Sequence, residues 1–247
     1  MIRILKWTAI VAVVIALSGL IISYALHEDE PSGRNPERAD LLADKMMTSV
    51  NKDAWDTTHA ITWNFMDRNS YLWDKRRGFV KVQWDDIHVL LNTKDQTGMA
   101  FRSGKELPEE EAGPLLEEAW SRFCNDSFWL NAVVKAKDPG TKRSIVELDD
   151  GREGLKVTYT TGGVTPGDSY VWILDENYRP ESFKMWVEII PIGGLEVTWE
   201  EWIQLETGAI VSTSHKTAKM EINVSDVRGA STLQKLTDGK DIFEPLL

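Results

Sequence analysis

The chain is long enough for one folded domain behind a short N-terminal segment, because about 210 of its 247 residues remain once roughly the first 35 are set aside. Its 28 basic and 39 acidic side chains give a formal net charge of −11, which repels phosphate backbones and excludes nucleic acid as a partner. The single cysteine, Cys124, excludes an intrachain disulfide and metal sites built on paired thiolates, and its apolar neighbours favour a small buried side chain.

The N-terminus carries the most specific signal in the sequence. From Trp7 to Leu26 there are 20 consecutive residues without a charge, and about 20 such residues cross a bilayer core as a helix. Arg3 and Lys6 precede this run and the acidic residues 28–30 follow it, so the positive-inside rule leaves residues 1–6 in the cytoplasm. We therefore predict a single-pass anchor at 7–26 in the inner membrane, with the C-terminal domain in the periplasm or outside the cell.

Two other N-terminal arrangements compete with an uncleaved anchor. Ser23-Tyr24-Ala25 has small residues where a signal peptidase prefers them, so a cleaved signal peptide stays open. Leu17-Ser18-Gly19 is similar to the residues before a lipidated cysteine, but Leu20 stands where that cysteine would be. Lipidation at this position is therefore excluded.

The next segment changes from linker to helix. Residues 27–36 are charged and contain Pro31, Gly33 and Pro36, a composition typical of a linker. We expect the folded domain at 37–247, beginning with a helix at about 37–51. Apolar residues recur there at spacings of three and four and define one face, made of Leu42, Ala43, Met46, Met47 and Val50.

Alternation of apolar and polar residues then predicts a series of short strands separated by turn residues. In the first half they fall at 61–65, 71–73, 80–84, 87–91 and 99–101. A second helix follows Pro108, opens with Glu109 to Glu111 and continues irregularly to Leu130 before the Pro139-Gly140 turn. In the second half strands fall at 144–148, 155–160, 169–174, 181–190, 196–203, 210–216 and 220–224.

These elements predict a mainly β (α+β) domain: a large curved antiparallel sheet forming an incomplete β-barrel, covered by two or three helices, behind the N-terminal transmembrane helix. Short connections between successive strands favour antiparallel pairing. The concave side of such a sheet must be covered by helices or occupied by an apolar ligand.

Residue patterns that carry chemistry are few. The histidines, at positions 27, 59, 88 and 215, lie far apart and are expected on the surface or on strands; phosphate-cradling, nucleotide and serine-hydrolase motifs do not occur. Asp149-Asp150-Gly151 has oxygens that suit calcium but is more typical of a hairpin turn. We predict no enzyme activity, no cofactor and no metal.

One predicted strand carries three carboxylates that could form a site. Glu196, Glu200 and Glu201 flank Trp199 and Trp202, an arrangement that could bind or cleave a sugar if one carboxylate had a raised pKa. The alternation places Glu196, Glu200 and Trp202 on one side and Trp199 and Glu201 on the other. A solvated strand face is therefore the simpler interpretation.

The large apolar residues of several predicted strands could line one concavity. We predict that they contact an apolar ligand, although ordinary core packing against the helices is the alternative. The predicted lining residues are Trp63, Phe65, Tyr71, Trp73, Tyr170, Trp172, Phe183 and Met185.

Several short motifs resemble a group of largely uncharacterised bacterial envelope proteins. They are Trp55-x-x-Thr58-x-Ala60-Ile61-x-Trp63-x-Phe65, Tyr71-Leu72-Trp73-Asp74-Lys75, Asn125-Asp126-Ser127-Phe128-Trp129-Leu130, and Gly163-Val164-Thr165-Pro166 with Tyr170. The resemblance covers about 53–224. That group in turn is similar in fold to the outer-membrane lipoprotein carriers, in which helices close an incomplete β-barrel around lipid acyl chains.

The resemblance implies a membrane-anchored, non-catalytic binding protein for a lipid or an acylated protein. It departs from the carriers, because the carrier is soluble and its receptor is lipid-anchored, whereas this chain has a predicted transmembrane helix and no lipidation cysteine. No carrier residue matches a numbered position here. The alternatives are a structural or protein-interaction domain of the envelope with a filled core, and an envelope hydrolase.

Overall fold

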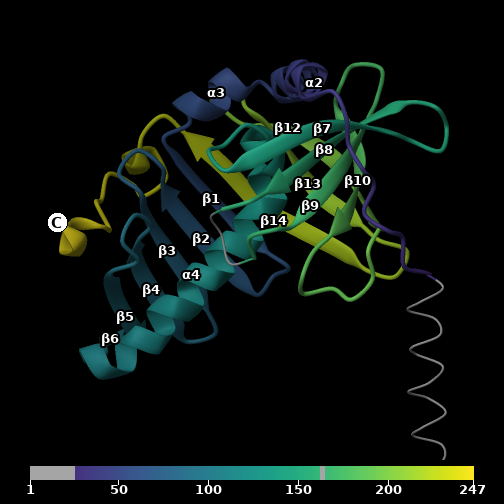
Figure 1. The fold of residues 1–247 in the computed structure, drawn as a ribbon. Coiled ribbons are helices and arrows are strands. Elements are labelled where there is room, and N and C mark those ends of the chain that lie inside the picture. Colours follow the sequence, from purple (N-terminus) through teal and green to yellow (C-terminus); the bar gives the residue numbers. More distant parts are fainter. Residues whose placement is uncertain (1–25, 162–164) are drawn as a thin grey trace, which may run out of the picture.

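The computed structural model describes residues 26–161 and 165–247 (Figure 1). Apart from Leu26, the anchor expected at 7–26 lies outside the described residues. The helices are α2 (Pro36–Ser49), α3 (Lys52–Thr57) and α4 (Glu109–Asn131), with short 3-10 helices at Ala132–Lys135, Leu233–Lys235 and Glu244–Leu246. The strands are β1 (Ala60–Phe65), β2 (Asn69–Asp74), β3 (Phe79–Trp84), β4 (Ile87–Asn92), β5 (Gly98–Arg102), β6 (Lys105–Glu106), β7 (Thr141–Glu147), β8 (Glu153–Tyr159), β9 (Ser169–Leu174), β10 (Pro180–Trp186), β11 (Leu195–Thr198), β12 (Glu200–Gln204), β13 (Ile210–Lys216) and β14 (Glu221–Ala230).

The strands form two antiparallel sheets joined by one bent strand. The larger has nine strands in the order β12-β13-β14-β1-β2-β3-β4-β5-β6, and the smaller has five in the order β11-β10-β9-β8-β7. Only Trp199 separates β11 from β12, and its N–H still donates to the Glu181 oxygen of the smaller sheet at 2.8 Å. Among the described strands β6 and β7 are both edges, so the sheets do not close into a barrel.

One face of both sheets carries most of the large apolar side chains, because alternation along each strand places every second residue there. We call it the inner face. Helix α4 lies across this face (Figure 1), and residues of both sheets, α2 and α4 share one core. On the opposite, outer face of the larger sheet, Phe79 and Leu90 pack with Leu233 and Phe243 of the C-terminal segment.

Helix α2 forms where the sequence predicts it. Asn35 caps its N-terminus by accepting a hydrogen bond from the Arg38 N–H, and Pro36 occupies the first turn, where its missing N–H costs nothing. Its apolar face is buried against the shared core. The buried residues are Ala39, Ala43, Met46 and Met47.

The mainly β, α+β architecture is confirmed, and within the described residues every strand and helix expected at 37–247 occurs close to its expected position. The single curved sheet is instead divided into two at Trp199. Beyond that residue the expected alternation is wrong: Trp202, expected opposite Trp199, stacks with it at 6.2 Å. Glu201 adopts a left-handed φ of 50°, which rotates the following side chains onto the other face.

Candidate functional site

The residues predicted to line a ligand all lie together on the inner face, beneath α4. Six of the eight are at most 8% exposed, and Phe65 and Trp73 are half-buried against the same core. Antiparallel pairing of neighbouring strands brings them together, as Trp63 faces Tyr71 and Phe183 faces Trp172 in the register. Their clustering on one face is what the alternation predicts, and their contact with a ligand stays a prediction.

Rings from α4 occupy the space over these residues. Phe123 makes an edge contact with Trp73 at 5.1 Å, and Phe128 lies 4.7 Å from the Tyr170 ring. Trp129 lies 5.8 Å from Phe183. In the structure one helix therefore occupies the space over the inner face. This arrangement is the core packing that the sequence offered as the alternative to a ligand.

A buried polar cluster fastens α4 to the larger sheet. Asp126 of α4 is 6% exposed and accepts hydrogen bonds from the Tyr71 hydroxyl at 2.5 Å and the Asn69 amide at 2.7 Å. Arg122 donates to the side-chain oxygen of Asn69 at 2.8 Å. Burial raises the pKa of Asp126, which the hydrogen bonds partly offset, and burial together with the nearby carboxylate raises the pKa of Tyr71. We call these four residues the α4 latch.

Several polar ring atoms on the inner face, most of them donors, lack a hydrogen-bond partner among the described residues. They are the indole N–H groups of Trp63, Trp73, Trp172 and Trp199, the Tyr159 hydroxyl and both nitrogens of His215. A buried polar group without a partner costs about 1 to 3 kcal/mol. Helix α4 thus covers the apolar surface of the inner face and leaves these polar atoms unsatisfied, although Asp126 satisfies Tyr71 and Asn69.

His215 and Tyr159 are the residues of this set that sequence reasoning did not single out, and His215 is the more deeply buried of the two. It lies on β13 as a strand histidine, but it is 0% exposed, wedged between Trp199 at 4.3 Å and Trp129 at 5.3 Å. Burial lowers its pKa to about 4, which nearby main-chain groups of Thr198 and Trp129 and the charge of Glu200 offset only in part. Apart from its place in an alternating strand, the sequence gives no sign that His215 is buried.

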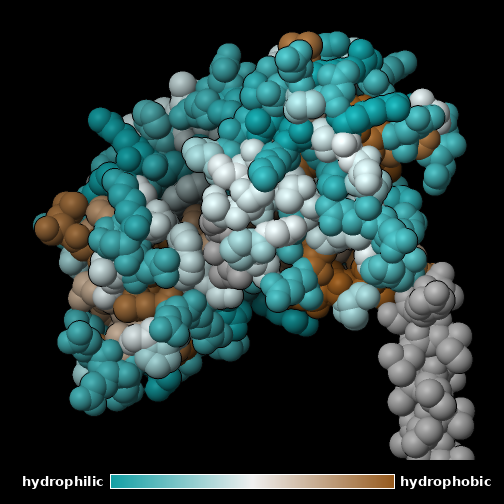
Figure 2. Space-filling model, in the orientation of Figure 1, coloured by the Kyte–Doolittle hydropathy of each residue, from teal (hydrophilic) through white to brown (hydrophobic). Residues whose placement is uncertain are grey.

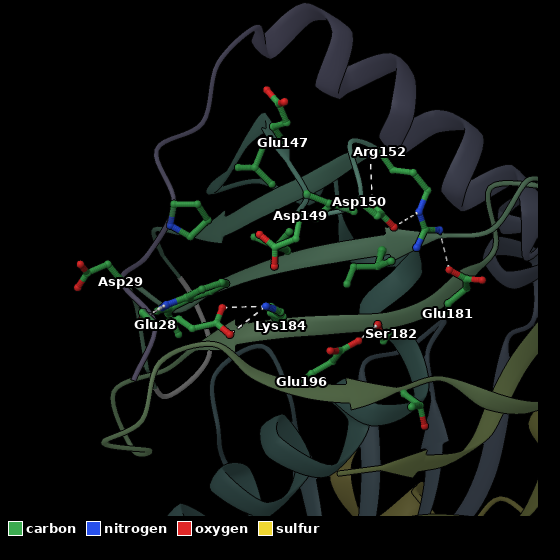
Figure 3. A pocket seen from close by; sticks show the side chains of 17 residues that line it. Glu28, Asp29, Glu147, Asp149, Asp150, Arg152, Glu181, Ser182, Lys184 and Glu196 are labelled. Atoms are coloured by element: carbon green, nitrogen blue, oxygen red, sulfur yellow. Dashed lines mark hydrogen bonds and ion pairs between the residues drawn. The ribbon is translucent and has the colours of Figure 1, made fainter. Parts of the chain in front are cut away.

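A concavity lies on the outer face of the smaller sheet (Figure 3). It has a volume of about 520 Å³. Val171, Ile173 and Trp186 supply apolar surface from the strand positions that point away from α4, and acidic side chains surround them. The acidic residues are Glu28, Asp29, Glu147, Asp149, Asp150, Glu181 and Glu196, against only Arg152 and Lys184.

Both basic side chains of the pocket are paired, with three of its seven acidic side chains. Lys184 contacts Glu28 at 2.8 Å, and Arg152 bridges Asp150 at 2.7 Å and Glu181 at 2.8 Å (Figure 3). The pKa of Lys184 is raised by its hydrogen bond to Glu28. Four acidic side chains remain beyond these pairs, so the wall of the pocket is mainly acidic.

The N-terminal end of the described chain forms one wall of this pocket. Residues 27–34 of the expected linker run along the sheet, where the Glu28 N–H donates to Gly193 O at 3.0 Å and the Trp186 indole donates to Glu28 O at 2.8 Å. Arg34 makes a bridge with Ile145 of edge strand β7. We call residues 27–34 the strap.

The carboxylates considered for sugar chemistry do not converge. Glu196 accepts from Ser182 at 2.6 Å in the outer pocket, whereas Glu200 pairs with Lys216 at 2.7 Å. The Lys216 hydrogen bond lowers the pKa of Glu200, the opposite of what a general acid needs. Asp149-Asp150-Gly151 lies at the β7–β8 turn, as the hairpin interpretation predicts.

No set of three or more His, Cys, Asp or Glu side chains in residues 26–161 and 165–247 is arranged to hold a metal ion. Over the same residues, the helices are too short or too polar for any of them to cross a membrane.

Comparisons with known proteins add little. No protein-family model matches the chain, and no curated protein matches it. Among solved structures, a crystal structure of a DUF1329 family protein from Desulfovibrio piger is similar over 79% of this chain and 93% of that chain, with 11% sequence identity and a TM-score of 0.41. At these values the likeness assigns neither a function nor a ligand to the chain.

Proposed function

We propose that this domain is a non-catalytic binding protein for a lipid or an acylated protein, held at the membrane by the anchor expected at 7–26. The guest occupies the inner face of the sheets in place of α4. The observation that carries the proposal is the set of buried ring donors that α4 leaves without partners. Ester or amide carbonyls of an acylated guest accept hydrogen bonds from such donors while its chain covers the rings.

The α4 latch determines how readily a guest can replace α4 on the inner face. Because Asp126 joins α4 to Tyr71 and Asn69 of β2, its removal weakens the helix contact without altering the apolar rings. Asp126→Ala is therefore expected to take up a fluorescent fatty-acyl probe more readily than the wild type. Glu118→Ala, which removes an exposed partner of Arg122 on the same helix, is the matched control and should bind the probe as the wild type does.

The test is native mass spectrometry of the full chain extracted from membranes in mild detergent. A bound lipid or acylated peptide on the wild type, together with greater probe uptake by Asp126→Ala, supports the proposal. An empty wild type, with Asp126→Ala merely less stable and equally unable to bind the probe, contradicts it.

A protein-interaction domain is the second candidate, and the filled inner face favours it. In that case α4 is a permanent part of the core, and the outer pocket, with its apolar floor and mainly acidic wall, contacts a basic segment of a partner. The same probe experiment separates the two, since a permanent α4 leaves no site for an acyl chain.

A further inference from the structure

The end of the domain where β10 meets β11 carries exposed apolar side chains. The β10–β11 loop, residues 187–194, reads Val-Glu-Ile-Ile-Pro-Ile-Gly-Gly, with one charge in eight residues. Ile189 in this loop is 71% exposed. Figure 2 shows hydrophobic surface at this lower end of the molecule.

Two further exposed apolar residues belong to the same end. In the antiparallel order β14-β13-β12, with β11 continuing into β12, the β10–β11 and β13–β14 connections fall on the same side of the strands. Met220 in the β13–β14 turn is 52% exposed, beside the exposed Lys219. Leu26, the first described residue, is 56% exposed.

The strap fixes Leu26 next to the β10–β11 loop. Gly193 accepts from the Glu28 N–H at 3.0 Å and donates to the His27 ring at 3.0 Å. Leu26 is two residues before Glu28, so it lies within about 7 Å of this contact. The 20 uncharged residues that the sequence predicts as a bilayer-spanning helix therefore end beside the exposed loop.

The loop is held at its base. The Glu188 N–H donates to Asp168 at 3.0 Å, and the Ile190 N–H donates to Val187 O at 3.2 Å. Ile189 is thus presented outward by a hydrogen-bonded turn. Isolated exposed apolar residues are ordinary, but these three lie at the one end of the domain that the predicted membrane helix reaches.

We propose that this end, formed by Leu26, the β10–β11 loop and the β13–β14 turn, rests in the interfacial layer of the phospholipid bilayer. Ile189 and Met220 lie among the headgroups and upper acyl chains, and Lys219 contacts lipid phosphate. The contact sets the domain upright on the anchor, with the strands directed toward the membrane and α2 directed away from it. It extends the proposed function by orienting the binding domain and does not depend on a guest.

The opposite end of the domain supplies the control. Lys45 of α2 donates to the Tyr178 hydroxyl in the β9–β10 turn at 2.9 Å, which places α2 at the other end of β10 from the loop. Leu41 of α2 is 64% exposed, close to the exposure of Ile189. A probe at Leu41 thus matches a probe at Ile189 in exposure and differs from it in position.

The experiment uses the full chain with Cys124→Ala and one new cysteine, Ile189→Cys, Met220→Cys or Leu41→Cys, labelled with the environment-sensitive fluorophore NBD. Each protein is reconstituted in vesicles of phosphatidylethanolamine and phosphatidylglycerol, with or without lipid spin-labelled near the top of the acyl chain. The proposal predicts a blue shift and quenching by the spin label at positions 189 and 220, and neither effect at position 41.

Absence of quenching at position 189, or equal quenching at 189 and 41, overturns the proposal. Full release of the unlabelled chain from membranes by alkaline carbonate overturns it as well, because Leu26 then has no bilayer beside it. Carbonate release also contradicts the anchor in the proposed function, whereas absence of quenching contradicts this inference alone. The acyl-probe measurement is unaffected by either result, so failure of this inference and failure of guest binding are distinguishable.

Discussion

Replacement of His215 by leucine is expected to remove a large part of the acid sensitivity of the domain. In the folded protein burial lowers the pKa of His215 to about 4, whereas an unfolded chain has an ordinary histidine value near 6.5. Between these values the unfolded state binds a proton that the folded state does not. Folding stability therefore falls as the pH is lowered through this window, and it is fully present above pH 6.5.

The magnitude follows from the two pKa values. Between pH 7.5 and pH 5, the linkage relation gives a loss of about 2 kcal/mol from this one side chain. Any further histidine contribution, such as that of His88, whose pKa burial also lowers, is the same in wild type and variant and cancels in the comparison. Leucine suits the site because Trp129 and Trp199 surround it with rings.

The assay is urea unfolding of the full chain in detergent micelles, followed by tryptophan fluorescence at both pH values. The free energy of unfolding of the wild type should fall by about 2 kcal/mol more than that of His215→Leu between pH 7.5 and pH 5. The absolute stability of the variant does not enter this comparison. An equal pH dependence in the two proteins would refute the burial argument.

Three other substitutions follow from individual contacts. Asp126→Ala leaves the buried Tyr71 hydroxyl without an acceptor and should lower the free energy of unfolding by about 3 kcal/mol, measured by urea unfolding, whereas an unchanged value would show that the α4 latch is not formed. Gly193→Ala places a methyl group 2.7 Å from Glu28 O, so the strap should detach and become sensitive to protease, while Gly113→Ala, with open space around it, should leave the cleavage pattern unchanged. Phe243→Ala empties a fully buried site on the outer face and should cost about 3 kcal/mol; a loss below about 1 kcal/mol would mean that the C-terminal segment is not docked.

The sequence predicts the strands and the inner face well because both depend on local alternation. Trp63, Tyr71 and Trp172 lie on the inner face because successive side chains in a strand point to opposite sides. The two long helices are predicted equally well, because their apolar residues recur at spacings of three and four. Such patterns require no knowledge of long-range contacts.

The bend between the sheets could not be predicted in the same way. It depends on Glu201 adopting a left-handed conformation, which is uncommon for glutamate and leaves no composition signal. The side of the strand on which Trp202 lies changes with it. One such residue is enough to reverse every later position in a pattern of period two.

The strap and the α4 latch were also beyond sequence reasoning. The strap is held by main-chain hydrogen bonds, such as that from Glu28 to Gly193. Almost every residue can make such bonds, so the sequence does not indicate where they form. The latch joins Asp126 to Tyr71 across 55 positions of the chain, and only the folded arrangement brings them together. That α4 fills the inner face likewise follows from the assembled core.

Hydrogen exchange of α4 with and without an acylated guest tests the central claim most directly. If a guest takes the place of α4 on the inner face, the amides of residues 115–131 should lose protection when a long-chain acyl ligand is added, while the strands β1, β2, β9 and β10 keep theirs. Unchanged or increased protection of α4 at saturating ligand would contradict the account.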